Sequence, residues 1–233
     1  MSFAFEQLPL AVQLRDDATF GNFYQADNGL LIAQLRDQLT KGERYNFVYG
    51  AQGAGCSHLL QAACHEAGKL GLESLYLPLA ELHEYRAEEL FEGLERLSLV
   101  CIDDIQIVIG DDYWESHLFH LFNRLKENDV MLLVSSKCAV RELPIKLADL
   151  ASRLSWGGVF QIRPLSDEQR HEVLKFRAAE RGMELSDEVA QYICYRCQRD
   201  TGSLLAVLDK LDLTSLKEQR RLTIPFVKAT MLW

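Results

Sequence analysis

A short glycine-rich segment, residues 50–58, constrains the fold of this chain more than any other feature. Its sequence is Gly50-Ala51-Gln52-Gly53-Ala54-Gly55-Cys56-Ser57-His58. Residues 45–49 before it are rich in β-forming side chains, and residues 59–70 after it have apolar side chains at helical spacing. A strand, a glycine turn and a helix in this order are typical of a phosphate-binding loop. In such a loop, backbone N–H groups and the helix N-terminus bind phosphate oxygens.

Strand and helix patterns alternate through most of the chain. Further strands are predicted at 74–77, 97–102, 130–135 and 159–162, and helices at 30–39, 82–94 and 117–125. This alternation predicts an α/β domain with a mostly parallel sheet covered by helices on both faces. After Pro164 only helices are predicted, starting near Ser166, Ser186 and Ile224 and covering 204–213. We therefore expect a tail (1–19), an α/β domain (20–165) and a small all-helical domain (166–233).

Charge and composition exclude several classes of protein. The net charge of −9 argues against broad, tight DNA binding, which requires a basic surface. No apolar run is long enough to span a bilayer, and no basic residue precedes the first apolar stretch, as a secretory signal would require. The six cysteines lie in segments that otherwise resemble core, which is typical of free thiols in a reducing compartment. We expect a cytoplasmic protein without membrane contact.

Cys56 occupies the position at which a phosphate-binding loop normally has lysine. That lysine reaches the β- and γ-phosphates, and a neutral thiol cannot replace its charge. Gly53, Ala54 and Gly55 still provide the backbone donors, and the Ser57 hydroxyl is expected to reach Mg²⁺. The loop should therefore hold a nucleoside diphosphate better than a triphosphate. A thiol at a helix start tends to have a lowered pKa, so Cys56 is either reactive or a small neutral filler.

Two carboxylates and two serines follow the next strands of the predicted sheet. Asp103 and Asp104 close the apolar strand at 97–102, and Ser135 and Ser136 end the strand after it. Carboxyl ends of parallel strands meet beside the phosphate loop, where Asp103 could hold Mg²⁺ through water and Asp104 could orient an attacking water. The serines could sense the γ-phosphate. The alternative for the carboxylates is a helix N-cap, and for the whole loop a plain strand-to-helix turn; the two features together favour nucleotide binding.

The sequence resembles the AAA+ ATPases of the DnaA type. Phe20-Gly21-Asn22-Phe23 is similar to the family's adenine-side motif, and Asp149-Leu150-Ala151-Ser152-Arg153-Leu154-Ser155-Trp156-Gly157 to its arginine-finger box. Leu222-Thr223-Ile224-Pro225-Phe226-Val227-Lys228 is similar to the C-terminus of members that inactivate DnaA. The resemblance implies that Asn22 and Phe23 contribute to the nucleotide site, in addition to the loop residues up to His58. It also implies that Arg153 acts in trans on ATP bound by DnaA; a surface arginine that caps a helix C-terminus is the alternative.

The resemblance also assigns a role to the N-terminal tail. Gln7, Leu8 and Leu10 are similar to the anchors with which the family docks on the DNA polymerase sliding clamp, although Ala11-Val12 departs from the usual ending. An unstructured terminus is the alternative. In this interpretation, contact with DNA occurs mainly through the clamp, and a homo-oligomer is compatible with the fold. The basic stretch 217–221, from Lys217 to Arg221, is either a solvated helix end or a contact for a partner or nucleic acid.

Three departures from the family pattern argue against an independent ATPase or initiator. Cys56 replaces the loop lysine, Gly202 falls where a sensor arginine is expected, and the sequence ends at Trp233 without a DNA-binding domain. We therefore expect ADP or another nucleoside diphosphate with Mg²⁺, weak or no ATPase activity, and stimulation of DnaA as the function. The rival hypotheses are a self-sufficient AAA+ ATPase and a DNA-binding accessory factor for initiation.

Overall fold

The computed structural model describes residues 13–198 and 200–233, and the chain divides into two compact units. The first unit runs from the first described residue to Phe23 and includes Asn28–Gly50 and Cys56–Ile162. The second contains Arg163–Trp233 together with two short segments from earlier in the chain, Tyr24–Asp27 and Ala51–Gly55. None of the described helices combines the length and the apolar character that a membrane span requires.

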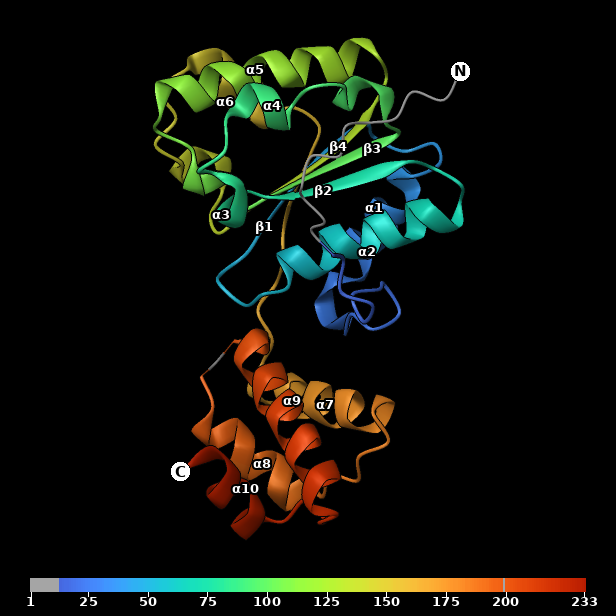
Figure 1. The fold of residues 1–233 in the computed structure, drawn as a ribbon, viewed down its shortest axis with the longest axis vertical. Coiled ribbons are helices and arrows are strands. Elements are labelled where there is room, and N and C mark those ends of the chain that lie inside the picture. Colours follow the sequence, from blue (N-terminus) through green and yellow to red (C-terminus); the bar gives the residue numbers. More distant parts are fainter. Residues whose placement is uncertain (1–12, 199) are drawn as a thin grey trace. The chain divides into compact units, whose positions relative to one another are not determined.

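A five-stranded parallel sheet forms the centre of the first unit (Figure 1), in the order β2-β3-β4-β1-β5. The strands are β1 (Tyr45–Tyr49), β2 (Ser74–Pro78), β3 (Leu99–Asp103), β4 (Met131–Ser136) and β5 (Gly158–Gln161). All residues of β3 and β4 are buried, because helices cover both faces of the sheet. The predicted parallel α/β fold is confirmed.

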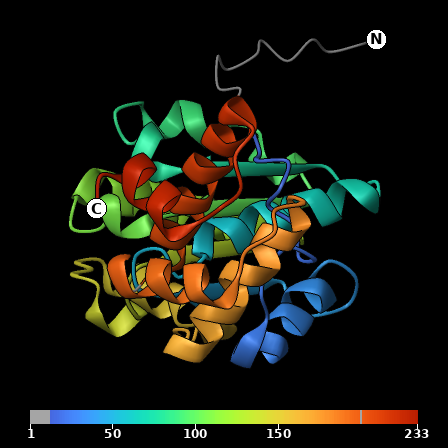
Figure 2. The same cartoon turned by 90° about the horizontal axis from the view of Figure 1, so that it is seen from below.

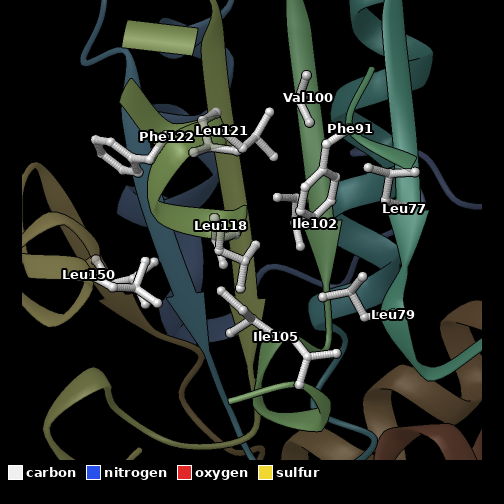
Figure 3. Packing of buried hydrophobic residues seen from close by; sticks show 14 of the residues in the cluster. Leu77, Leu79, Phe91, Val100, Ile102, Ile105, Leu118, Leu121, Phe122 and Leu150 are labelled. Atoms are coloured by element: carbon white, nitrogen blue, oxygen red, sulfur yellow. The ribbon is translucent and has the colours of Figure 1, made fainter. Parts of the chain in front are cut away.

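Helices form a layer on each face of the sheet (Figure 1). On one side lie α1 (Gly29–Gln38) and α2 (Cys56–Lys69); on the other lie α3 (Leu79–Leu82), α4 (Ala87–Leu90), α5 (Asp112–Glu127) and α6 (Ala148–Leu154). Apolar side chains of the second layer and of the sheet point toward one another and form one core, in which Ile102, Leu121 and Leu150 are fully buried (Figure 3). Burial of this apolar surface is the main force that holds α5 and α6 on the sheet.

Four helices make up most of the second unit, and Figure 2 shows them in orange to red. They are α7 (Asp167–Glu180), α8 (Asp187–Arg196), α9 (Thr201–Glu218) and α10 (Ile224–Met231). The side chains of Ser166 and Ser186 cap α7 and α8 at their N-termini, as the sequence predicts. A separate core, which includes Leu204, Leu208 and Phe226, holds these helices together.

Two helix predictions need correction, and one further helix was not predicted. The helix predicted at 82–94 is wrong: the segment forms α3, α4 and a 3₁₀ turn at Leu94–Arg96, with Arg86 extended and Gly93 at φ +75°. The helix predicted at 117–125 is longer, because Asp111 caps it and it starts at Asp112. The helix α6 is not among the predicted elements.

Candidate nucleotide-binding site

The glycine turn connects β1 to α2 directly, as a phosphate loop requires. Gly53 and Gly55 adopt φ values of +75° and +107°, a region that a side chain would strain. At the strand side of the turn, the Gly50 N–H donates to the carbonyl of Ser136 at 3.2 Å. Within the turn, the Ala54 N–H donates to the carbonyl of Ala51 at 2.9 Å. The backbone therefore has the tight left-handed turns that direct successive N–H groups inward in such loops.

Cys56 begins α2 with its side chain turned toward the end of β4. Its sulfur lies 3.8 Å from the carbonyl oxygen of Ser136, and the side chain is partly buried. Burial raises the pKa of the Cys56 thiol to about 12, and the carboxylates of Asp103 and Asp104 act in the same direction. The expectation that the helix start lowers the pKa of this thiol is therefore wrong. At neutral pH the group is an uncharged thiol, which corresponds to the neutral filler rather than the reactive cysteine.

Asp103 ends β3 with its carboxylate buried between two hydroxyl donors. The Tyr76 hydroxyl donates to Asp103 Oδ2 at 2.5 Å, and the Ser135 hydroxyl donates to Oδ1. Only 2% of Asp103 is exposed, and Ser135 is fully buried. Both oxygens of the carboxylate thus already accept a hydrogen bond from a neighbouring strand.

Asp104 follows with a positive φ of 57°. Its N–H donates to the Ser135 hydroxyl oxygen at 3.0 Å, and its Oδ1 accepts a hydrogen bond from Gln106 Nε2 at 2.7 Å. Gln106 in turn accepts from the N–H of Lys137 at 3.1 Å, so the carboxylate is tied to the segment after β4. Asp104 precedes the 3₁₀ turn Ile105–Ile107, but its side chain makes no capping hydrogen bond. The N-cap alternative for this residue therefore lacks its characteristic bond.

Ser135 and Ser136, the predicted sensors, have different partners. The Ser135 hydroxyl is committed to Asp103 and to the Asp104 N–H, inside the protein. The Ser136 hydroxyl accepts from the N–H of Cys138 at 3.3 Å. Both side chains are buried, so their first role in this structure is to fix the end of β3 and the turn after β4.

The oxygen donors near α2 suit a hard cation such as Mg²⁺, which usually takes one or two protein ligands plus phosphate oxygens and water. Ser57 is exposed at the start of α2, and its hydroxyl opposes the rise that burial causes in the pKa of Tyr76. Tyr76 in turn is hydrogen-bonded to Asp103. Within the described part of the chain, no group of three or more His, Cys, Asp or Glu side chains could hold a metal by itself. The donor set fits Mg²⁺ held jointly with phosphate.

The segment before α1 lies against the start of α2. His58 Nε2 is 2.8 Å from the carbonyl oxygen of Thr19, and its ring centroid is 5.6 Å from that of Phe23. Asn22 Nδ2 donates to the carbonyl of Asp17 at 3.0 Å. The structure therefore brings Asn22, Phe23 and His58 together next to the phosphate-loop helix.

Arg153 lies in the last turn of α6, in the helix layer on the face of the sheet opposite to α2 (Figure 1). Its guanidinium carbon is 5.5 Å from the ring centroid of Trp156 and 6.0 Å from that of Phe122. Lys126 also lies on the Trp156 ring, with Nζ 3.5 Å from the centroid. Among residues 13–198 and 200–233, no carboxylate forms an ion pair with Arg153. The structure thus separates Arg153 from the other predicted site residues.

Sequence reasoning missed Tyr76 as the neighbour of Asp103. Tyr76 lies two residues before Pro78, which pairs with Asp103 in the β2–β3 register, so both side chains leave the same face. The alternation of side chains along β2 places Tyr76 beside Asp103 only when the pairing register of β2 and β3 is known, and the sequence does not give that register. The clamp-binding residues Gln7, Leu8 and Leu10 lie outside the described residues.

The parallel sheet, the phosphate-loop connection after β1, the acidic end of β3 and the helical second unit define a P-loop protein of the AAA+ class. The chain belongs to the bacterial DnaA ATPase-domain family, whose model matches residues 14–161. Residues 167–231 match the model of the lid domain of Hda, so the helical unit is a lid domain of that type.

Solved structures agree with this assignment. Domain III of the replication initiation protein DnaA from Thermotoga maritima superposes with a TM-score of 0.81 at 22% identity, over 94% of this chain and 97% of that one. DnaA from Aquifex aeolicus bound to AMPPCP superposes with a TM-score of 0.74 at 26% identity, and the match covers 88% of this chain and 68% of that one. The Holliday junction branch migration motor RuvB from Thermotoga maritima superposes with a TM-score of 0.67 at 17% identity, and the match covers 90% of this chain and 68% of that one. The two matches below 25% identity support the shared fold alone.

Proposed function

We propose that this chain is a regulator of replication initiation that holds ADP in its own site and promotes hydrolysis of ATP bound to DnaA. The observation that carries the proposal is the neutral thiol of Cys56 at the position of the loop lysine. A chain with this loop retains backbone donors for a diphosphate but lacks the side chain that stabilises charge on the γ-phosphate. Its chemistry is then expected to take place in a partner.

The nucleotide site supports binding more than turnover. The turn 50–55 and the start of α2 would supply N–H groups for phosphate, and Asn22, Phe23 and His58, which lie beside this helix, would contact the base. Ser57 and Asp103 would hold Mg²⁺, which supplies positive charge next to the phosphates when it is bound. The AMPPCP-bound DnaA of Aquifex aeolicus shows that a relative of this fold accepts a nucleotide.

Arg153 is the side chain proposed to act on the partner. An arginine supplied in trans stabilises the charge of a transferring phosphoryl group, and its planar fork suits phosphate oxygens. The absence of an ion-pair partner for Arg153 within the described residues leaves its donors available. The aromatic rings of Trp156 and Phe122 orient the guanidinium without neutralising it.

Clamp docking and assembly complete the proposal. Gln7, Leu8 and Leu10 would dock the chain on the sliding clamp, and contact with DNA would then follow from the clamp. This arrangement agrees with a net charge of −9, which disfavours independent DNA binding. The partners proposed are therefore ATP-bound DnaA and the clamp, with a homo-oligomer compatible with the fold.

The direct test is to identify the nucleotide released when the purified protein is denatured, and to measure ATP turnover with and without ATP-loaded DnaA. We expect a nucleoside diphosphate, negligible turnover by the chain alone, and turnover that requires DnaA. The Asp104→Asn variant distinguishes the proposal from the rival hypothesis of a self-sufficient ATPase. Robust turnover by the chain alone, lost in Asp104→Asn, would show a self-sufficient ATPase and contradict the proposal.

Removing residues 1–12 is expected to abolish clamp binding and to leave ADP affinity unchanged, because the nucleotide site is built from later residues. Surface plasmon resonance on immobilised clamp and titration with a fluorescent ADP analogue measure the two properties. Gln7→Ala in the full chain is the milder matched variant. Clamp binding that survives the truncation would contradict the docking role of this segment.

A further inference from the structure

The hydroxyl of Tyr76 is hydrogen-bonded to one of the two groups expected to hold Mg²⁺. It donates to Asp103 Oδ2 at 2.5 Å from the neighbouring strand β2. The phenol has a single proton, and in this structure that proton goes to Asp103. One carboxylate oxygen of Asp103 is therefore already occupied by Tyr76.

This arrangement is fixed by packing. Tyr76 is 7% exposed, Asp103 2% and Ser135 0%. Asp103 and Tyr76 lie on adjacent, register-fixed strands, and Gln61 lies on the buried face of α2. The hydroxyl cannot leave Asp103 without leaving a buried carboxylate oxygen unpaired, which is unfavourable.

The second oxygen of Asp103 is occupied as well. The Ser135 hydroxyl donates to Oδ1, and the same hydroxyl oxygen accepts from the Asp104 N–H at 3.0 Å. Each donor withdraws electron density from the carboxylate and occupies a lone-pair direction. Asp103 is consequently a weaker acceptor for a metal-bound water than a carboxylate without such partners.

We propose that Tyr76 is a positioning residue that competes with Mg²⁺ for Asp103 and so makes diphosphate binding only weakly dependent on the metal. The proposal rests on the proposed function, because it concerns the ADP site described there. The structural basis is the pair of hydrogen bonds on Asp103: the hydroxyls of Tyr76 and Ser135 already occupy the carboxylate oxygens to which a metal-bound water would otherwise donate. A site of this kind can retain ADP when free Mg²⁺ varies.

The test is the ratio of ADP affinities measured with Mg²⁺ and with a chelator, for the full chain and for Tyr76→Phe. A fluorescent ADP analogue gives both dissociation constants at equilibrium, without hydrolysis. Removing the hydroxyl frees Asp103 Oδ2 and keeps the ring. We expect the ratio to increase by at least about tenfold, which corresponds to one hydrogen bond to a charged group.

Two further variants make the result specific. Tyr45→Phe removes a buried hydroxyl that donates to the carbonyl of Leu154 at 3.0 Å, away from this site, and should leave the ratio unchanged. In Asp103→Asn the added Tyr76→Phe change should no longer alter the ratio, because the two side chains act through one bond. A folded Tyr76→Phe protein with the original ratio would overturn the proposal. Failure of the unmodified chain to bind ADP under either condition would instead overturn the proposed function on which it rests.

Discussion

Replacing Arg153 by alanine is expected to reduce the stimulated hydrolysis of ATP on DnaA by at least about a thousandfold, the range in which trans-acting arginines contribute. The loss should fall on the rate of hydrolysis, because the guanidinium is proposed to stabilise charge that develops in the transition state. The folded state should change little. Arg153 lies over the rings of Trp156 and Phe122 and forms no ion pair within the described part of the chain, and cation–π contacts contribute about 0.5–1 kcal/mol at exposed sites.

Phosphate release from DnaA loaded with radiolabelled ATP measures this effect, and thermal unfolding of the variant checks its fold. Arg141→Ala is the matched control, since Arg141 is an exposed arginine of the same unit whose neighbour is Glu142 at 3.9 Å. Arg153→Lys should restore little activity, because an ammonium group lacks the planar fork. Undiminished stimulation by folded Arg153→Ala would show that the residue is a surface arginine without this role.

Replacing Cys56 by lysine is expected to raise the affinity for ATP relative to ADP by about tenfold or more. The new ammonium group would reach the γ-phosphate, and a hydrogen bond to a charged group contributes about 1.5–3 kcal/mol. The surroundings favour the change, because Asp103 and Asp104 are the charges that raise the pKa of the present thiol. The same carboxylates would stabilise a cation at this position.

Competition between ATP and a fluorescent ADP analogue measures the ratio of affinities. Cys56→Met is the matched control, because it adds length without charge and should not favour ATP. If Cys56→Lys binds the analogue normally and shows the same ratio as Cys56→Met, the missing lysine does not explain the preference for a diphosphate.

The positions of the strands, the phosphate-loop connection and the lid helices could be predicted from local sequence. Alternation and apolar runs identify strands, and Ser166 and Ser186 mark helix starts through their capping bonds. The region 82–94 could not be predicted, because its apolar residues have helical spacing while Gly93 and the extended Arg86 interrupt the backbone. There, tertiary packing in the first core decides the conformation.

The sequence predicts that the ends of β3 and β4 lie beside the start of α2, but it does not predict the electrostatics of this region. The sequence identifies Cys56, Asp103 and Ser135 from the ends of elements. It does not show that Asp103 lies close enough to raise the pKa of Cys56, or that Tyr76 and Ser135 occupy both oxygens of Asp103. These properties depend on strand register and burial, which are set by the whole sheet.

The stacking of Lys126 and Arg153 on Trp156 gives the molecule an optical reporter at the proposed contact with DnaA. Trp156 is 47% exposed, whereas Trp114 is 6% exposed and packed in the core. Indole emission depends on solvent and on nearby charge, so the fluorescence of Trp156 changes when the environment of the Arg153 guanidinium beside it changes. The third tryptophan, Trp233, is only partly buried and belongs to the second unit, so once it is replaced by phenylalanine, partner engagement at this helix can be followed by fluorescence without an added label.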